Sequence, residues 1–425
     1  MNFTSAQAVI NHLYALPRLH PKADLSYINR VLQILGNPQN QVKTVHVTGT
    51  NGKGSTSYYL SNLLQKAGQK TGLFVSPYVF SFNERIQLNG ERISDHDLVN
   101  VANQVEEAIL QVQRQDPDFG LVIFEYEVVL AFVYFVQKKC DYAVIEVGIG
   151  GEHDKTNVIT PEVSIITTIG LDHEEVIGPT IKEIAQEKSG VIKFQRPVVL
   201  GYIPAEALPI ITHKAAAEAA PVKRLGLDFS LTWGRKILYS DKFHTVKLTS
   251  RPQVEEIDAA LAICAFSLLH LPLSSGEVAA AINQTVIPGR YQIVQERPLV
   301  ILDGAHNVQA MQSLLAFVRQ EQVDRRGRLR ILLTMMQDKD MEQVFALFNQ
   351  TEEVELTTLD YQRAAKKADF PGWVQQKYPY QPDWQEAYRE MRQASQTNDI
   401  LLVTGSFYLV GNILQMEDKN AGTGK

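Results

Sequence analysis

Short apolar runs alternate with stretches of helical periodicity along most of the chain. The first clear pair is an apolar run at 44–48 and a helical pattern at 55–67, whose apolar side chains fall on one face before Gly68. Further apolar runs that predict buried strands lie at 73–75, 142–147, 163–169 and 197–200. Strands that alternate with helices are typical of an α/β protein with a largely parallel sheet.

A second series of the same kind begins near Leu299. Apolar runs at 299–302, 331–335, 354–359 and 400–404 predict strands, and helical patterns lie between them at 311–318, 341–348 and 384–391. The pair Pro288-Gly289 precedes this series and disfavours a continuing helix. A chain of 425 residues is also long for one domain. We therefore expect two α/β domains, of which the second is smaller and Rossmann-like.

Composition narrows the class of protein without identifying it. The net charge of −6 offers no basic surplus for binding nucleic acid, although a locally positive anion site remains compatible with it. Cys140 and Cys264 are too few for a disulfide framework or a thiolate metal site, which suits a reducing compartment. The most apolar stretch, 123–136, contains two glutamates and is shorter than the ~20 apolar residues of a membrane span. No signal-peptide pattern opens the sequence, so we expect a cytoplasmic protein without nucleic-acid or membrane partners.

A glycine-rich loop joins the first predicted strand to the first predicted helix, with the sequence Gly49-Thr50-Asn51-Gly52-Lys53-Gly54-Ser55. Glycines let several backbone N–H groups converge on a phosphate, and the start of the helix adds positive potential. Lys53 would contact the terminal phosphates, and the Ser55 hydroxyl would lie near phosphate and metal. The spacing is tighter than in the common P-loop, and a glycine-rich turn of a βα unit is the alternative. The context favours a nucleotide phosphate site.

Three polar residues lie at or just after the ends of other predicted strands and belong to the same sheet edge. They are Ser76, Glu146 and His173. Because ligands of open α/β sheets bind beyond the carboxyl ends of the strands, a hydroxyl, a carboxylate and an imidazole beside a phosphate loop indicate a Mg²⁺ site. Histidine is a less usual Mg²⁺ ligand, and each residue alone is equally compatible with an ordinary strand end. Lys188, next to a glycine near a predicted helix end, has the pattern of a solvated charge that favours the helix dipole.

The loop with its preceding threonine, Thr-Gly-Thr-Asn-Gly-Lys-Gly-Ser, resembles the phosphate loop of the folylpolyglutamate and dihydrofolate synthases, a branch of the Mur ligase superfamily. Further landmarks of that family follow in order along nearly the whole chain. They are the segments 76–78, 82–86, 146–151, 154–157, 171–173, 288–291, 303–307, 338–340 and 405–409.

The resemblance implies a role for specific residues. Its metal ligands are Ser76, Glu146, His173 and Lys188, the last as a carbamylated lysine. Its ATP-binding residues are the loop 49–55, the position of Glu256, and Arg290 and Asp303. Its catalytic residues are Lys53, Glu146, His173, Lys188, Asp303 and His306, and its candidate substrate contacts are Arg85, Asp154, His306 and Ser406. It divides the chain into a P-loop-type ATPase domain at 1–287, a hinge at 288–292 and a glutamate-ligase domain at 293–425.

The activity implied by the resemblance is ATP-dependent amide formation. With ATP and Mg²⁺, the enzyme would add L-glutamate to a reduced folate or folylpolyglutamate through an acyl phosphate, and would act as a monomer. Dihydropteroate as the acceptor, or activity on both acceptors, remains open. A Mur peptide ligase fits the order of landmarks less well. From other classes, a P-loop kinase shares the phosphate loop, and a non-catalytic ATP- or folate-binding relative would not need the metal ligands.

Three segments depart from the family pattern. Where the family has Gly-x-x-Gln-x-x-Asn, this chain has Ser250 and Glu256 in place of the glycine and the asparagine, and a carboxylate lacks the donor of an amide. Where the family has Thr-x-Phe-Glu-x-x-Thr, Val122 and Val128 replace the threonines. Thr334 also stands where glycine is usual. These departures predict altered adenine recognition and altered substrate preference.

Overall fold

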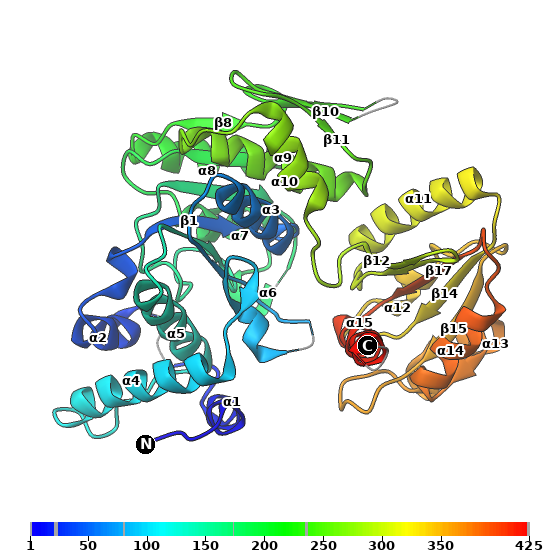
Figure 1. Cartoon of the computed structure of the whole chain (residues 1–425), viewed down its shortest axis with the longest axis horizontal. Helices are drawn as coiled ribbons and strands as arrows, with labels where there is room; N and C mark the ends of the chain where they lie inside the picture. Colours follow the sequence, from blue (N-terminus) through cyan, green and yellow to red (C-terminus); the bar gives the residue numbers. More distant parts are fainter. Residues whose placement is uncertain (1, 21–23, 80, 173, 234–236, 423–425) are drawn as a thin grey trace. The chain divides into compact units, whose positions relative to one another are not determined.

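The computed structural model describes residues 2–20, 24–79, 81–172, 174–233 and 237–422 (Figure 1). The chain divides into two compact units. Unit 1 comprises residues 1–250 and 255–285, and unit 2 comprises residues 251–254 and 286–425. The change of unit after Thr285 falls just before the Pro288-Gly289 pair. Whether 288–292 acts as a hinge stays a prediction.

Unit 1 is built on an eight-stranded, mainly parallel sheet in the order β4-β3-β2-β5-β1-β6-β7-β8. Central strand β1 pairs in parallel with β5 and β6, so that Val45 lies between Val144 and Val163. A strand buried on both faces needs apolar residues at consecutive positions, which explains the continuous runs in the sequence. The strands are β1 (Lys43–Thr48), β2 (Thr71–Phe74), β3 (Ile86–Leu88), β4 (Glu91–Arg92), β5 (Tyr142–Glu146), β6 (Val163–Thr168), β7 (Val198–Tyr202) and β8 (Val222–Arg224).

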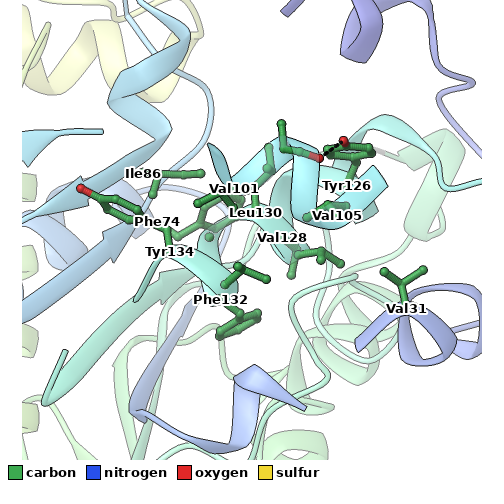
Figure 2. Close-up of a cluster of buried hydrophobic side chains, with 14 of the residues drawn as sticks. Val31, Phe74, Ile86, Val101, Val105, Tyr126, Val128, Leu130, Phe132 and Tyr134 are labelled. Carbon is green, nitrogen blue, oxygen red and sulfur yellow. Dashed lines mark hydrogen bonds between the residues drawn. The ribbon is translucent and has the colours of Figure 1, made fainter. Parts of the chain in front are cut away.

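Helices cover this sheet and supply most of the core of unit 1. One hydrophobic cluster joins α1, α2, α4 and α5, and Val31, Val105 and Val128 belong to it (Figure 2). No helix of the described residues is long and apolar enough to cross a membrane. The helices are α1 (Ala6–Ala15), α2 (Ser26–Ile34), η1 (Pro38–Asn40), α3 (Lys53–Lys66), η2 (Phe82–Arg85), α4 (Asp95–Gln113), α5 (Ile123–Gln137), α6 (Glu174–Ile177), α7 (Ile181–Ser189), α8 (Leu208–Ala217), α9 (Gln253–Leu268) and α10 (Ser275–Gln284).

A small antiparallel sheet in unit 1 was not expected from the sequence. It contains β9 (Ser230–Thr232), β10 (Ile237–Ser240) and β11 (Thr245–Leu248), in the order β11-β10-β9. Its strands are three or four residues long, and only alternate residues of β10 and β11 are buried. Such short alternating segments carry a weaker signal than the continuous apolar runs of the large sheet.

Unit 2 is a second α/β layer structure with the strand order β12-β13-β17-β14-β15-β16. Only the edge strand β12 is antiparallel to its neighbour. The fold class expected from the sequence is therefore confirmed. The elements are β12 (Gln292–Glu296), β13 (Leu299–Leu302), α11 (Val308–Arg325), β14 (Leu329–Leu333), α12 (Met341–Phe345), β15 (Glu353–Thr357), η3 (Lys367–Asp369), α13 (Gly372–Lys377), β16 (Tyr380–Gln381), α14 (Trp384–Ala394), β17 (Ile400–Thr404) and α15 (Phe407–Gly422).

Candidate active site

The glycine-rich loop joins β1 to α3 at the carboxyl edge of the large sheet. Gly52 is the residue before α3 and has φ +85°, a backbone conformation that glycine adopts without strain. A Cβ at Gly52 would overlap the carboxylate of Asp258, and a Cβ at Gly49 would overlap the Thr167 hydroxyl. The loop is therefore held against β6 and α9 at positions where only glycine fits.

Hydrogen bonds to the end of β6 fix the shape of the loop. The Thr50 N–H donates to the Thr168 carbonyl at 2.9 Å, and the Asn51 N–H donates to the Thr168 hydroxyl at 2.9 Å. The Thr50 hydroxyl donates to the Gly170 carbonyl at 3.0 Å. A loop fixed in this way presents its backbone to a ligand with little ordering to be lost on binding.

Two lysines meet at one carbonyl of this loop. Lys53 Nζ donates to the Gly49 carbonyl at 2.8 Å and to the Thr50 carbonyl at 3.2 Å, and Lys188 Nζ, from α7, donates to the same Gly49 carbonyl at 2.9 Å. Lys188 is buried rather than solvated. Burial, together with the nearby charge of Lys53, lowers the pKa of Lys188 to about 7, while the carboxylates of Asp172, Asp154 and Glu187 act in the opposite direction.

Glu146 and Ser76 also lie at this loop. The Ser76 N–H donates to Glu146 Oε2 at 2.9 Å, and both Glu146 oxygens lie 3.6 Å from where a Cβ on Gly54 would be. Glu146 is 4% exposed. A buried carboxylate and a hydroxyl-bearing residue beside a phosphate loop are a donor set that suits Mg²⁺, which prefers oxygen ligands and substrate phosphates. The residues of this site that are described therefore fit the metal predicted from the sequence.

The remaining predicted ligand, His173, lies outside the described residues. Among the residues that are described, no group of three His, Cys, Asp or Glu side chains is arranged to hold a metal. Of the predicted metal ligands, the structure therefore describes Glu146, Ser76 and Lys188, all beside the phosphate loop.

Asp154 is buried and is engaged by its own loop. Its Oδ2 accepts from the Ile149 N–H at 2.9 Å, and its Oδ1 accepts from the N–H of Thr156 at 2.9 Å and from its hydroxyl. Burial raises the pKa of Asp154, and these hydrogen bonds act in the opposite direction. Asp154 therefore shapes the turn after β5, and its predicted contact with substrate stays a prediction.

Glu256 lies in the first turn of α9, close to the phosphate loop. Its Oε2 accepts a hydrogen bond from the Trp233 indole N–H at 2.8 Å, and it is 3% exposed. Two residues further along α9, Asp258 lies against Gly52. Glu256 was predicted from the sequence, whereas Asp258 and Trp233 were not. The acidic run 255–258 was a signal for Asp258, whereas nothing in the sequence pointed to Trp233.

The second unit gathers its own predicted site residues around the ends of β13 and β17. Asp303 accepts from the N–H groups of Tyr291 and Ala305, both at 2.8 Å, and Arg290 lies over the Phe407 ring at 4.4 Å. His306 Nδ1 is 2.8 Å from the Gly304 carbonyl. Burial raises the pKa of Asp303, and the Arg290 charge opposes this shift. Ser406 is buried beside them and accepts from the Tyr408 N–H at 3.1 Å.

Comparison with known proteins agrees with this architecture. The Mur ligase middle domain matches residues 124–263, and the Mur ligase glutamate ligase domain matches residues 289–407. The folylpolyglutamate synthase of Lacticaseibacillus casei is 33% identical, over 98% of each chain. The dihydrofolate synthase/folylpolyglutamate synthase of Bacillus subtilis is 32% identical, over 97% of this chain and 99% of the relative.

Solved structures match over the same extent. The apo form of the L. casei synthase has a TM-score of 0.85 at 30% identity, and covers 98% of this chain and 99% of that one. Escherichia coli FolC in complex with DHPP and ADP has a TM-score of 0.86 at 26% identity, with the same coverage. The chain belongs to the Mur ligase family. Within that family, it groups with the folylpolyglutamate and dihydrofolate synthases.

Proposed function

We propose that this chain is an ATP-dependent ligase that joins the amino group of L-glutamate to a carboxylate of a reduced folate or folylpolyglutamate. The observation that carries the proposal is the meeting of Lys53, Glu146 and Ser76 around the loop 49–55. The L. casei relative bears the name of this activity. A similar solved structure, 30% identical with a TM-score of 0.80, is an FPGS complex with AMPPCP and folate.

The reaction proceeds in two balanced steps. An oxygen of the acceptor carboxylate attacks the γ-phosphorus of ATP, the bond to the β–γ bridging oxygen breaks, and ADP and an acyl phosphate result. The amine of glutamate then attacks the acyl carbon, the bond to the phosphate oxygen breaks, and the amine nitrogen gives up a proton. The acyl phosphate reacts readily with water, so the second step needs water to be excluded.

The residues of unit 1 serve the first step by position and charge. The Thr50 and Asn51 N–H groups are bound to β6, so the later N–H groups of the loop, at the start of α3, would face the phosphates. Lys53 would supply a cation where negative charge develops. Ser76 and Glu146, together with His173, would hold Mg²⁺, which neutralises phosphate oxygens when bound. The Gly49 carbonyl keeps Lys53 at the loop until a phosphate competes for its ammonium group.

Lys188 serves this site best as a carbamate. The neutral amine nitrogen adds to the carbon of CO₂ and releases a proton, which gives an anion with the ligand character of a carboxylate. A pKa near 7 leaves a substantial neutral fraction of the amine at physiological pH, which ordinary lysines lack. The new negative charge would face Lys53 in place of a second positive charge. This inversion of charge supports Lys188 as a metal ligand.

Unit 2 would contribute Arg290, Asp303, His306 and Ser406 to nucleotide and substrate binding, with 288–292 as the hinge. Arg85 and Asp154 of unit 1 would contact substrate. The permanently charged guanidinium of Arg290 suits phosphate oxygens. We propose 1–287 as the ATPase domain, 293–425 as the glutamate-ligase domain, and a monomer as the working state.

Dihydropteroate is a second acceptor with specific support. The B. subtilis and E. coli relatives carry both activities in their names. The two valines that depart from the family pattern are both buried, and Val128 packs in the hydrophobic cluster of α5 (Figure 2). Val128 is therefore a core residue, and its exchange does not by itself argue against either acceptor.

The test is ligation of radiolabelled L-glutamate with ATP, with a tetrahydrofolate and dihydropteroate offered separately. We expect a labelled amide, with one ADP and one phosphate released for each bond, and loss of product in Lys53→Ala. A phosphorylated pterin without glutamate would instead identify a kinase. Binding of ATP without any turnover would identify a non-catalytic relative.

A further inference from the structure

A buried ion pair lies beside the candidate active site, and one of its members, Glu127, has no role in the function described above. Glu127, on α5, is 2% exposed, and its Oε1 lies 3.3 Å from Arg85 Nε, at the end of η2. The guanidinium of Arg85 also lies over the ring of Tyr78, 5.2 Å from its centre. Tyr78 in turn shares a 2.6 Å hydrogen bond with Tyr14 of α1. We refer to these four residues as the Arg85 cluster.

The contact between Glu127 and Arg85 is electrostatic rather than a well-formed hydrogen bond. Neither Glu127 Oε1 nor Arg85 Nε has a hydrogen-bond partner among the described residues. Burial raises the pKa of Glu127 to about 7, and the Arg85 charge only partly opposes this shift. A buried carboxylate with so little compensation is costly to the fold, so its stabilising value does not explain its presence.

One edge of the Arg85 guanidinium forms no hydrogen bond with the described residues. The Nε side faces Glu127, and no described residue forms a hydrogen bond with Nη1 or Nη2. Those two nitrogens form the edge that grips a carboxylate through two parallel hydrogen bonds. Arg85 is therefore prepared for an anion that the described residues do not provide.

The backbone connects Arg85 to the candidate metal site. Its carbonyl accepts from the Val75 N–H at 3.0 Å, and the N–H of the next residue, Ser76, donates to Glu146. An anion held by Arg85 would thus bind near the carboxyl end of β2, where the phosphate loop also lies. The substrates of the proposed reaction carry such anions.

We propose that Glu127 is a positioning residue that holds the Nε edge of Arg85, so that the terminal edge is presented to a carboxylate of a glutamyl group. The proposal rests on the proposed function, which brings two sources of that group to the enzyme. One is the incoming L-glutamate, and the other is the glutamyl tail of the acceptor. Glu127 acts through Arg85 and does not touch the substrate.

The test compares Glu127→Gln with the matched control Glu106→Gln. Glu106 is another buried carboxylate of the same core, hydrogen-bonded to Tyr126 of α5 at 3.0 Å. For both variants, the KM values for L-glutamate, tetrahydrofolate and ATP, kcat and Tm are measured at pH 8. In Glu127→Gln we expect one carboxylate KM to rise about fivefold, because a charge-assisted contact is roughly twice as strong as a neutral one. The KM for ATP and kcat should stay unchanged in Glu127→Gln. In the control Glu106→Gln, the three KM values and kcat should all stay unchanged.

The result also identifies the source of the carboxylate. A rise in KM for L-glutamate assigns the cluster to the incoming amino acid, and a rise in KM for tetrahydrofolate assigns it to the acceptor tail. Unchanged KM values for both would overturn the proposal. So would a joint rise of all three KM values with a fall in Tm, because that pattern indicates a merely structural role.

The pH profile gives a second readout. The groups that face Glu127 are Arg85 and Tyr14, with Tyr78 beyond them, and burial raises the pKa of Tyr14 above its ordinary range. Glu127 therefore titrates first as the pH falls. The carboxylate KM of the wild type should rise below pH 7 relative to that of Glu127→Gln, and parallel profiles would contradict the proposal.

Failure of the proposed function gives a different result. If the wild type ligates no pterin, binding of L-glutamate and folic acid is measured by calorimetry without turnover. Weaker binding of either ligand to Glu127→Gln still supports the positioning role, and equal binding overturns it.

Discussion

Lys53 and Lys188 donate hydrogen bonds to the same carbonyl oxygen, that of Gly49, at 2.8 and 2.9 Å. Two ammonium groups so close repel each other, and Lys188 is also buried. The arrangement is costly while both lysines are protonated. It becomes favourable if Lys188 loses its charge or becomes an anion, and this links the loop to the proposed carbamate.

The first prediction concerns Lys188 and pH in CO₂-free buffer. The folded pKa is about 7 and the ordinary value is 10.5, so the unfolded chain binds more protons between these pH values and stability rises with pH there. The energetic cost of burying the protonated Lys188 is fully present below about pH 7. We expect the free energy of unfolding of Lys188→Met to exceed that of the wild type by on the order of 3 kcal/mol at pH 6. This difference should shrink towards pH 10. Denaturant unfolding at several pH values measures it, and a difference independent of pH would contradict a depressed pKa.

The second prediction concerns the loop glycine Gly52. Gly52→Ala places a Cβ on the Asp258 carboxylate in a left-handed backbone conformation, so it should cost more than 3 kcal/mol and abolish nucleotide binding. Gly68→Ala is the control, because Gly68 has a similar φ of +77° and nothing within 4 Å of the added Cβ. It should cost only about 1 kcal/mol. Thermal unfolding measures the stability of both variants, and titration with ATP measures their nucleotide binding. Equal losses of stability in the two variants would show that backbone strain alone matters.

The third prediction concerns Glu127 and the cost of its burial. Its pKa rises from 4.5 in the unfolded chain to about 7 in the folded protein, so the folded state binds more protons between these values and stability falls as pH rises through them. Glu127→Gln should therefore be about 2 kcal/mol more stable than the wild type at pH 8 and no more stable below pH 4.5. Greater stability with weaker carboxylate binding would separate function from folding. A variant less stable at pH 8 would show that the charge supports the fold.

The fourth prediction concerns adenine recognition by Glu256. A carboxylate only accepts hydrogen bonds, whereas adenine presents both a donor and acceptors. Glu256→Gln keeps an oxygen for the Trp233 indole and adds a donor, so the KM for ATP should fall about threefold. Steady-state kinetics with ATP measures it, with Glu106→Gln as the control. A higher KM in Glu256→Gln would mean that the carboxylate is itself the better ligand for this base.

Much of the fold followed from patterns within single segments. The strands at 299–302 and 400–404 were predicted to the residue, because buried parallel strands are uninterrupted apolar runs. Strand β14 begins two residues earlier than expected, since Arg330 is buried there by its ion pairs with Asp399 and Glu353. A charged residue gives no sign in the sequence that it belongs to a strand.

The candidate active site was predictable only in part, because some of its contacts join segments that are far apart in the sequence. The phosphate loop is local, so its glycines and Lys53 were recognisable. Lys188 has the local pattern of a solvated helix end, and its burial against Gly49 depends on a contact between distant segments. The pairs Trp233–Glu256 and Arg85–Glu127 are of the same kind. The local sequence around each of these residues does not reveal its partner, because the two partners lie far apart in the chain.

The most direct test of the ligase chemistry follows one oxygen atom. The acceptor is prepared with ¹⁸O in its reacting carboxylate, and the phosphate released during glutamate ligation is analysed by mass spectrometry. An acyl phosphate predicts one ¹⁸O in each phosphate, with neither label transfer nor amide in Lys53→Ala. Amide formation with unlabelled phosphate would contradict the account, because the carboxylate oxygen would then never have attacked phosphorus.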